Sequence, residues 1–311
     1  GRCLIVSPFF YGLNISMDIK ILHVEASTHC NARCPLCPRN IHGYNVPGVY
    51  SELNLTTTVF EKVLEQFPSR TFVYFNGNLG DPMMNPNILS LAELTNCYTN
   101  IFTNGSIGRK ETWIGLAKKH GEVTFSIDGL EDTNHLYRQD VEWNKIMERV
   151  KWFIDAGGTA VWKWVVFKHN HHQIEQGKIM AQQLGFKSFD VVDHGRNYGP
   201  VLNKKAEITH WILPHDGSRQ PTTHDVPASI DRYKSDHANW KNHQGKNYEI
   251  DCEHEREQKV YVDVQGQLSP CCYQGFELPN RKRVDMLQFP ELKKTWKTKS
   301  CDNICASTCG K

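Results

Sequence analysis

Three cysteines stand close together near the start of the chain, in the stretch STHCNARCPLCPRN that runs from Ser27 to Asn40. Cys30, Cys34 and Cys37 follow the spacing C-x3-C-x2-C. A structural zinc ion or an ordinary iron–sulfur cube takes four protein ligands. The loop therefore either lacks one ligand or leaves one coordination position open for another molecule.

The cysteine content of the whole chain also favours metal binding. The sequence holds 11 cysteines, and they are clustered, with three at 30–37 and five at 271–309 preceded by Cys252. In a protein of this size, clustered cysteines favour metal sites over a disulfide framework. Cys3 and Cys97 lie outside the clusters and are expected to be unligated thiols.

Length and charge limit the classes of protein that fit. A chain of 311 residues is long enough for one large domain and a small one. Its 36 basic and 34 acidic residues give no electrostatic case for nucleic acid as the main partner. No apolar run is long enough to span a membrane, and residues 1–17 make a poor signal peptide. We therefore expect an N-terminal extension over 1–17 and a cytoplasmic protein.

The elements that must position the cysteines follow an alternating pattern. Short runs typical of strands alternate with amphipathic stretches typical of helices, which indicates parallel βαβ units. The expected strands are Ile19–Val24, Thr71–Phe75, Asn100–Thr103, Val123–Ile127, Ala160–Phe167 and Phe189–Val192. The expected helices are Thr57–Gln66, Ile88–Thr95, Lys110–Lys119, Trp143–Ala156 and His171–Leu184. Such units form an open wound sheet or a full or partial barrel, and six are two short of a complete eight-fold barrel.

Helix ends and the later part of the chain complete this plan. Thr57 is the expected N-cap of the first helix, and Gly185 is expected to end the fifth. After about Pro200 the alternation stops, and residues 201–250 form a polar bridging segment. The stretch 257–272 predicts a β-hairpin around Gln265-Gly266. Residues 251–311 are poor in apolar side chains, so a metal is expected to stabilise this small region.

The three-cysteine loop, placed directly after a first strand, resembles the signature of the radical S-adenosylmethionine (radical SAM) enzymes. The resemblance covers about residues 18–200 and implies a partial (β/α)6 barrel of the TIM type. In that family three thiolates bind three irons of a 4Fe-4S cluster, and S-adenosyl-L-methionine (AdoMet) chelates the fourth iron. The ligand missing from the loop would then be the cosubstrate. The chain departs from the family pattern at Leu36, where many members carry an aromatic residue.

Further stretches resemble the AdoMet-binding motifs of this family. The stretch Leu79–Pro82 resembles the family's GGEP motif, which implies that Gly80 and Asp81 bind the AdoMet amino group through backbone and carboxylate. The stretch TNGS places Asn104 near the ribose.

The fourth strand adds residues for the AdoMet carboxylate. Ser126 and Arg138, twelve residues apart, resemble the pair that binds this carboxylate in relatives that modify peptides and sulfatases. A guanidinium group is suited to such a bidentate contact. Asp128, at the end of the same strand, is a candidate to contact substrate, and a turn-capping role fits it equally well.

The C-terminal cysteines resemble a SPASM/twitch module, an accessory iron–sulfur domain. The matching pieces are Cys252, Gly266-x4-Cys271, and then Cys301, Cys305 and Cys309 at x3 intervals. Their number suits a single auxiliary 4Fe-4S cluster, and the expected ligands are Cys252, Cys271, Cys305 and Cys309. Cys301 competes for one of these places, whereas Cys272, next to a ligand, is expected to point the other way along a strand.

The resemblance implies an oxidoreductase that reductively cleaves AdoMet to a 5′-deoxyadenosyl radical, which then abstracts a substrate hydrogen atom. A low-potential donor such as flavodoxin or ferredoxin would supply the electron. We expect oxidation or crosslinking of a peptide or protein side chain. The alternatives are a twitch-type dehydrogenase of a small alcohol or aminocyclitol, a non-catalytic iron–sulfur or zinc scaffold, and a methyl or methylthio transferase.

Simpler interpretations exist for several of these residues. The first three cysteines would form a zinc knuckle if His23 or His42 completed the site, and the C-terminal cysteines would suit a structural zinc ion. The sequence HNHHQ, His169 to Gln173, suggests a metal site at first sight. It fits the start of a helix with exposed histidines better.

Overall fold

The structure is a computed structural model, which describes residues 19–45, 52–193, 198–221, 253–269 and 271–272. Within these ranges, eight strands form one sheet in the order β10-β9-β1-β2-β3-β4-β5-β6. Strands β1 to β6 are all parallel to their neighbours. Their bounds are β1 (Ile21–Val24), β2 (Phe72–Phe75), β3 (Tyr98–Thr103), β4 (Gly121–Ser126), β5 (Thr159–Val165) and β6 (Ser188–Val192). All six predicted strands are confirmed.

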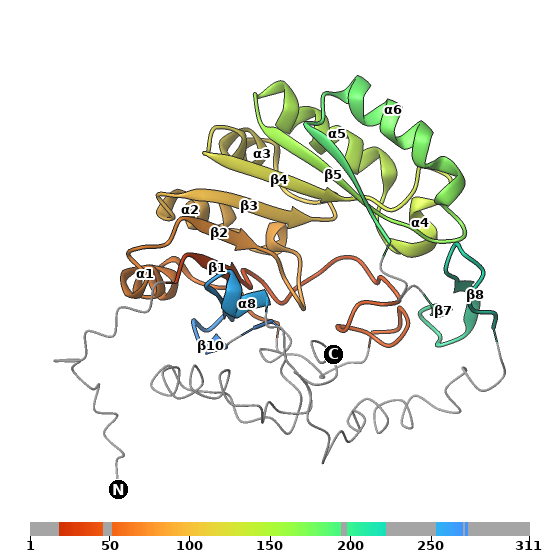
Figure 1. Cartoon of the computed structure of the whole chain (residues 1–311), viewed down its shortest axis with the longest axis horizontal. Coiled ribbons are helices and arrows are strands. Elements are labelled where there is room, and N and C mark those ends of the chain that lie inside the picture. The colour runs from red at the N-terminus through yellow and green to blue at the C-terminus, as the bar shows by residue number, and fades with distance from the viewer. Residues whose placement is uncertain (1–18, 46–51, 194–197, 222–252, 270, 273–311) are drawn as a thin grey trace, which may run out of the picture.

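Helices along one face of the curved sheet connect the parallel strands (Figure 1). They are α1 (Thr57–Gln66), α2 (Ile88–Leu94), α3 (Lys110–Ala117), α5 (Trp143–Asp155) and α6 (Ile174–Leu184). The five predicted helices are confirmed, and Gly185 ends α6 in the left-handed conformation. The predicted N-cap of α1 was wrong by one residue, because the side chain of Thr56, not Thr57, accepts the Val59 amide.

Aromatic side chains fill the space between the sheet and these helices. The Trp113 and Phe125 rings stack with centroids 5.4 Å apart, and Phe153 packs edge-on against both. All three side chains are at most 1% exposed. Burying one such side chain contributes about 1.5–3 kcal/mol, so this cluster fixes the sheet that carries the strand ends.

The fold class predicted from the sequence, an α/β partial barrel of six units, is confirmed. An extra hairpin extends the sheet beyond β1. Strand β9 (Lys259–Val262) pairs parallel with β1, and β10 (Leu268–Ser269) pairs antiparallel with β9. Gly266 adopts φ +78° in the turn, and Asp263 accepts the amides of Gln265 and Gln267, which confirms the predicted hairpin.

The first part of the predicted bridging segment contains structure that the sequence did not suggest. Strands β7 (Gly199–Leu202) and β8 (Ile208–Ile212) form an antiparallel pair. Val201 and Ile212 pack with Phe167 in a small second cluster, against which Leu36 of the cysteine loop also packs.

Parts of the predicted domain plan cannot be compared with the structure. Residues 1–17, most of the bridging segment and most of the C-terminal region lie outside the described residues, so the domain boundaries stay predictions. Within the described ranges, no helix combines the length and the apolar character needed to cross a membrane.

Candidate functional site

One cavity at the carboxyl ends of the barrel strands collects the predicted cluster and AdoMet residues. It has a volume of about 150 Å³ and lies where barrel active sites are found. All eight residues predicted for the cluster and for AdoMet line it: Cys30, Cys34, Cys37, Gly80, Asp81, Asn104, Ser126 and Arg138. The sequence placed these residues on four different loops, and the fold brings them together.

The cysteine loop after β1 is shaped by its own backbone. The Cys37 amide donates to the Cys34 carbonyl at 3.0 Å, and the Asn40 amide donates to the Cys37 carbonyl at 3.2 Å. Arg33 fixes the loop from outside, through the Gly43 carbonyl and the Asp140 carboxylate, both at 2.6 Å.

The three thiols form a set of soft donors, of which Cys34 is buried and Cys30 and Cys37 are partly buried. Burial raises the pKa of Cys30 and Cys34, and it raises the pKa of Cys37 to about 12. The nearby Asp81 and Cys34 raise the pKa of Cys30 further. Such thiols become thiolates when a metal cation replaces their protons. Since neither His23 nor His42 lines the cavity, the described residues give no support to the zinc knuckle.

The loop after β2 approaches the cysteine loop closely at Gly80. A Cβ atom on Gly80 would lie 1.9 Å from the Ser27 carbonyl oxygen, so only glycine fits. The next residue, Asp81, donates its amide to the His29 carbonyl at 2.8 Å. The backbone from Gly77 to Asp81 therefore forms one wall of the cavity.

The Asp81 side chain is occupied by contacts within the protein. It accepts hydrogen bonds from the Thr103 hydroxyl and from the amides of Asn104 and Met83, all at 2.8–3.0 Å. Burial raises its pKa, while these hydrogen bonds oppose the rise. The carboxylate thus joins the ends of β2 and β3 and caps the short 3-10 helix η1 (Pro82–Met84).

Glu25, directly after β1, binds the loop that lines the cavity, a role that sequence reasoning missed. It is 1% exposed, and its carboxylate accepts the amides of Asn78 at 2.6 Å, Leu79 at 3.2 Å and Gly80 at 3.1 Å. The Tyr261 hydroxyl donates to it at 2.8 Å. Burial raises the Glu25 pKa to about 7. An acidic residue directly after the apolar run of β1 was the signal available in the sequence.

Asn104 belongs to a small polar network. Its side chain donates to Asn31 at 2.9 Å and accepts from the Ser106 hydroxyl at 2.6 Å, and Asn31 donates to Ser106 at 2.8 Å. Asn104 thereby connects the β3 loop to the cysteine loop. Its predicted role near the ribose stays a prediction.

Arg138 and Asp128 form a buried ion pair behind the cysteines. The Arg138 Nε donates to Asp128 at 2.6 Å, and its Nη1 lies 3.7 Å from the Cys34 sulfur. Burial would lower the Arg138 pKa, but the neighbouring Asp128 and Cys34 raise it overall, so the guanidinium stays charged.

Asp128 is occupied on both carboxylate oxygens. It is fully buried, and its second oxygen accepts the Val165 amide at 2.7 Å. It does not line the cavity. These contacts suit a residue that positions Arg138, and the predicted contact with substrate stays a prediction.

The remaining predicted metal residues are only partly described. Cys252, Cys305 and Cys309, with the competitor Cys301, lie outside the described residues, so the auxiliary cluster stays a prediction. In the HNHHQ stretch, the short helix η2 (His171–Gln173) leads into α6, and His171 and His172 are exposed. The predicted helix start is confirmed, whereas the prediction of exposed histidines is wrong for His169, whose two ring nitrogens are buried.

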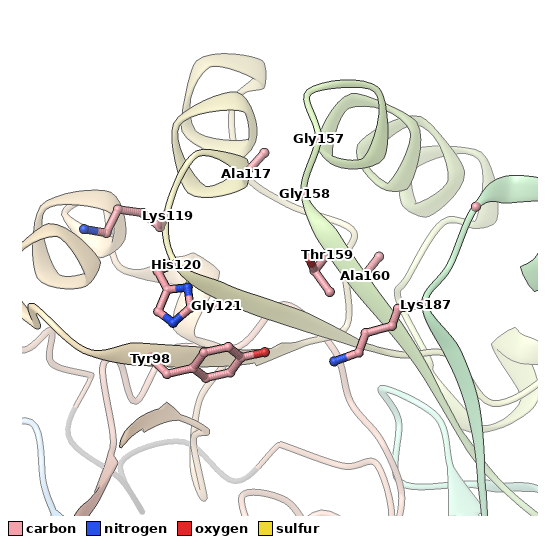
Figure 2. Close-up of a pocket in the computed structure, with 11 residues that line it drawn as sticks. Tyr98, Ala117, Lys119, His120, Gly121, Gly157, Gly158, Thr159, Ala160 and Lys187 are labelled. Carbon is pink, nitrogen blue, oxygen red and sulfur yellow. The ribbon is translucent and has the colours of Figure 1, made fainter. Parts of the chain in front are cut away.

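A second cavity lies at the opposite, amino ends of β3 to β6 (Figure 2). It is larger, at about 530 Å³, and Tyr98, Lys119, His120 and Lys187 line it. Figure 2 shows Tyr98 and Lys187 reaching toward each other from different segments. Both donate to the Glu122 carboxylate, at 3.1 and 3.0 Å. None of the residues that the sequence predicted to bind the cluster, AdoMet or the substrate lines this cavity.

No family model matches the chain. A Pyrococcus furiosus protein, the tungsten-containing aldehyde ferredoxin oxidoreductase cofactor-modifying protein, is 25% identical over 225 residues. The match covers 62% of this chain and 60% of the relative, so the chain spans about three fifths of the length of that relative.

Two solved structures with bound AdoMet share the fold. SuiB from Streptococcus suis bound to S-adenosylmethionine matches with a TM-score of 0.58 and 16% identity, over 92% of this chain and 67% of that one. Native anSMEcpe with bound AdoMet matches with a TM-score of 0.57 and 16% identity, over 93% and 88%. At this identity the comparison establishes the fold, and the chain shares that fold with these two AdoMet-bound proteins.

Proposed function

We propose that this chain is a radical SAM enzyme that oxidises or crosslinks a peptide or protein side chain. The observation that carries the proposal is the cavity at the carboxyl ends of the strands. Three thiols, one buried and two partly buried, converge there with Arg138, and no histidine lines the same space. The fold shared with two AdoMet-bound structures supports the proposal.

The donor set fits a 4Fe-4S cluster with one open iron. Cys30, Cys34 and Cys37 would bind three irons, and the described lining residues offer no fourth thiolate or imidazole. When bound, such a cluster would supply an open iron for AdoMet and the electron that cleaves it to methionine and a 5′-deoxyadenosyl radical. The chain itself would bind and orient AdoMet and the substrate, and it would exclude water from them.

Two groups of this chain would hold the AdoMet amino acid end. Arg138 keeps its charge in a buried position and offers a fork of donors suited to a carboxylate. The Asp81 carboxylate is already engaged by Thr103 and two amides. The contact to the amino group would therefore come from backbone carbonyls between Gly77 and Asp81, which Glu25 holds in place.

Peptide substrates have support from the structural neighbours. SuiB has been solved with its precursor peptide SuiA, and anSMEcpe with the Cp18Cys peptide. The name of the Pyrococcus furiosus relative, a cofactor-modifying protein, supports the second candidate, a dehydrogenase acting on a small molecule. The auxiliary cluster on Cys252, Cys271, Cys305 and Cys309 and the flavodoxin-like or ferredoxin-like electron donor belong to the proposal in both cases.

Anaerobic reconstitution with iron counting tests the proposal. The wild-type chain should hold about eight irons, and the Cys30/Cys34/Cys37→Ala variant about four. The reduced wild type should release 5′-deoxyadenosine from AdoMet, and the variant should not. S-adenosylhomocysteine among the products would indicate the transferase alternative. A reduced, iron-loaded chain that leaves AdoMet intact would identify a non-catalytic scaffold.

A further inference from the structure

A second group of side chains able to bind a metal lies outside the three-thiol cavity, in and around strand β1. His23 lies in β1, His254 lies in the short helix α8 (Glu253–Arg256), and Cys272 follows β10 (Figure 1). Each offers one ligand atom, and these three atoms lie within 4.8 Å of one another. None of the three residues lines the three-thiol cavity.

Both histidines are buried in a way that favours a bound cation. His23 is 8% exposed and His254 is 9% exposed. The Nδ1 atom of His254 is buried without a hydrogen-bond partner in the described part of the chain, which costs about 1–3 kcal/mol when nothing satisfies it. Each imidazole ring has a nitrogen that can bind a metal ion through its lone pair.

The groups around these side chains orient them as metal ligands are oriented. Nε2 of His23 lies 2.7 Å from the Asn76 carbonyl, so this nitrogen donates its proton and Nδ1 keeps the lone pair. A backbone carbonyl on the second ring nitrogen is a common feature of metal-bound histidines. The Asn78 side chain donates to the Cys272 carbonyl at 3.0 Å. The same loop thus supports two of the three ligands.

The distances between the donor atoms and their chemical types favour zinc. Zinc bonds of about 2.0–2.1 Å to nitrogen and 2.3 Å to sulfur place tetrahedral ligand atoms about 3.3–3.8 Å apart. The separations here, at most 4.8 Å, would have to shorten to that range by side-chain rotation when a zinc ion binds. Two imidazoles and one thiolate suit zinc, whereas iron–sulfur clusters are held mainly by thiolates.

We propose that His23, His254 and Cys272 bind one zinc ion, separate from both iron–sulfur clusters. The ion joins the segment after β10 and helix α8 to the central strand β1. Because Asn76 and Asn78 also line the three-thiol cavity, the ion braces the loop that forms one wall of that cavity. This inference does not depend on the proposed enzymatic activity.

Metal analysis of the full-length chain tests the proposal. The chain is reconstituted with iron, incubated with zinc alone, passed over a desalting column and analysed for both metals. We expect one zinc per chain in the wild type. The His254→Ala and Cys272→Ser variants should lose more than the roughly 10–100-fold in zinc affinity that loss of an outer-shell partner costs. X-ray absorption at the zinc edge should show mixed nitrogen and sulfur ligands.

Control variants test whether loss of zinc is specific to the three proposed ligands. His172→Ala removes an exposed histidine, Cys97→Ser removes a thiol outside both sites, and both should keep the zinc. If His254→Ala folds poorly, His254→Cys should restore zinc binding, since it offers a ligand at the same place. Zinc retained in His254→Ala would overturn the proposal. So would a Cys272→Ser variant that loses about four irons while its zinc is unchanged, because Cys272 would then belong to the auxiliary cluster.

Discussion

The two ends of the barrel sheet each carry a cavity, and they differ in size and in chemistry. The cavity at the amino ends measures about 530 Å³, within the range of about 300–1,000 Å³ common for small-molecule sites, whereas the one at the carboxyl ends measures about 150 Å³. Of these two cavities, the one at the amino ends is the larger. The three thiols and Arg138 all lie at the carboxyl end.

The two ends differ more clearly in how deeply their charged side chains are buried than in the volumes of their cavities. At the carboxyl end, Glu25, Asp81 and Asp128 are 1%, 5% and 0% exposed, and each is engaged by several donors. At the amino end, Lys187 is exposed and forms an ion pair with Glu122. Burying acidic groups is costly unless other groups compensate, so their concentration at the carboxyl end makes that end the stronger candidate for a functional site.

The largest expected effect comes from removing a thiol at the carboxyl end, and removal of a thiol at the amino end is its control. Cys34→Ala should reduce AdoMet cleavage to the background rate and remove about four irons, because two thiolates cannot hold the cluster. The matched control is Cys97→Ala, since Cys97 lies just before β3 at the amino end. Equal loss of iron and of 5′-deoxyadenosine in both variants would contradict the assignment of the carboxyl-end cavity.

The next effect concerns the buried ion pair at the carboxyl end. Arg138→Met should cost about 3–5 kcal/mol of unfolding free energy, because it leaves Asp128 buried and unpaired. AdoMet binding should fall at the same time, since the carboxylate-binding fork is gone. Chemical denaturation and AdoMet titration measure the two effects.

The Arg138→Lys variant keeps the positive charge and removes the planar guanidinium group, so it shows which of the two AdoMet binding needs. It should recover part of the stability and little of the AdoMet affinity, because an ammonium group lacks the planar fork. AdoMet affinity that stays unchanged in both Arg138 variants would place the cosubstrate elsewhere.

A smaller effect is expected at Glu25. Glu25→Gln keeps one oxygen to accept the amides of Asn78 and Leu79, but its amide group then faces the Gly80 N–H. The lost hydrogen bond should cost about 1–3 kcal/mol and lower AdoMet affinity about tenfold, since about 1.4 kcal/mol corresponds to a factor of ten. Glu65→Gln on the exposed side of α1 is the control and should change neither quantity.

Much of the barrel could be predicted from the sequence because each element carries a local signal. The strands are short runs rich in β-branched and aromatic residues, and the helices between them have a clear apolar face. The cysteine loop was recognisable because its residue types and spacing are specific by themselves. Arg138 was predicted by a resemblance and by its distance from Ser126.

The rest of the site depends on contacts between distant segments. Glu25 binds the loop that lines the cavity because this loop, which follows β2, and Tyr261, 236 residues away, both turn toward it. The Asp81 carboxylate accepts a hydrogen bond from Thr103 on the neighbouring strand, a contact that the sequence does not indicate, and its role toward AdoMet stays a prediction. Strands β7 and β8 were missed because they are short and because their buried residues Val201 and Ile212 pack against Phe167, a residue from a distant segment.

The smallest expected effect tests the amino-end cavity itself. Lys119→Ala removes a positive charge from its lining, where the structure places none of the residues predicted to carry chemistry. A surface substitution of this kind changes stability by about 0.5 kcal/mol or less. We expect unchanged iron content and unchanged release of 5′-deoxyadenosine. A clear loss of AdoMet cleavage in a folded Lys119→Ala variant would show that the larger cavity also serves the reaction, and that burial of charge does not by itself distinguish the two ends of this sheet.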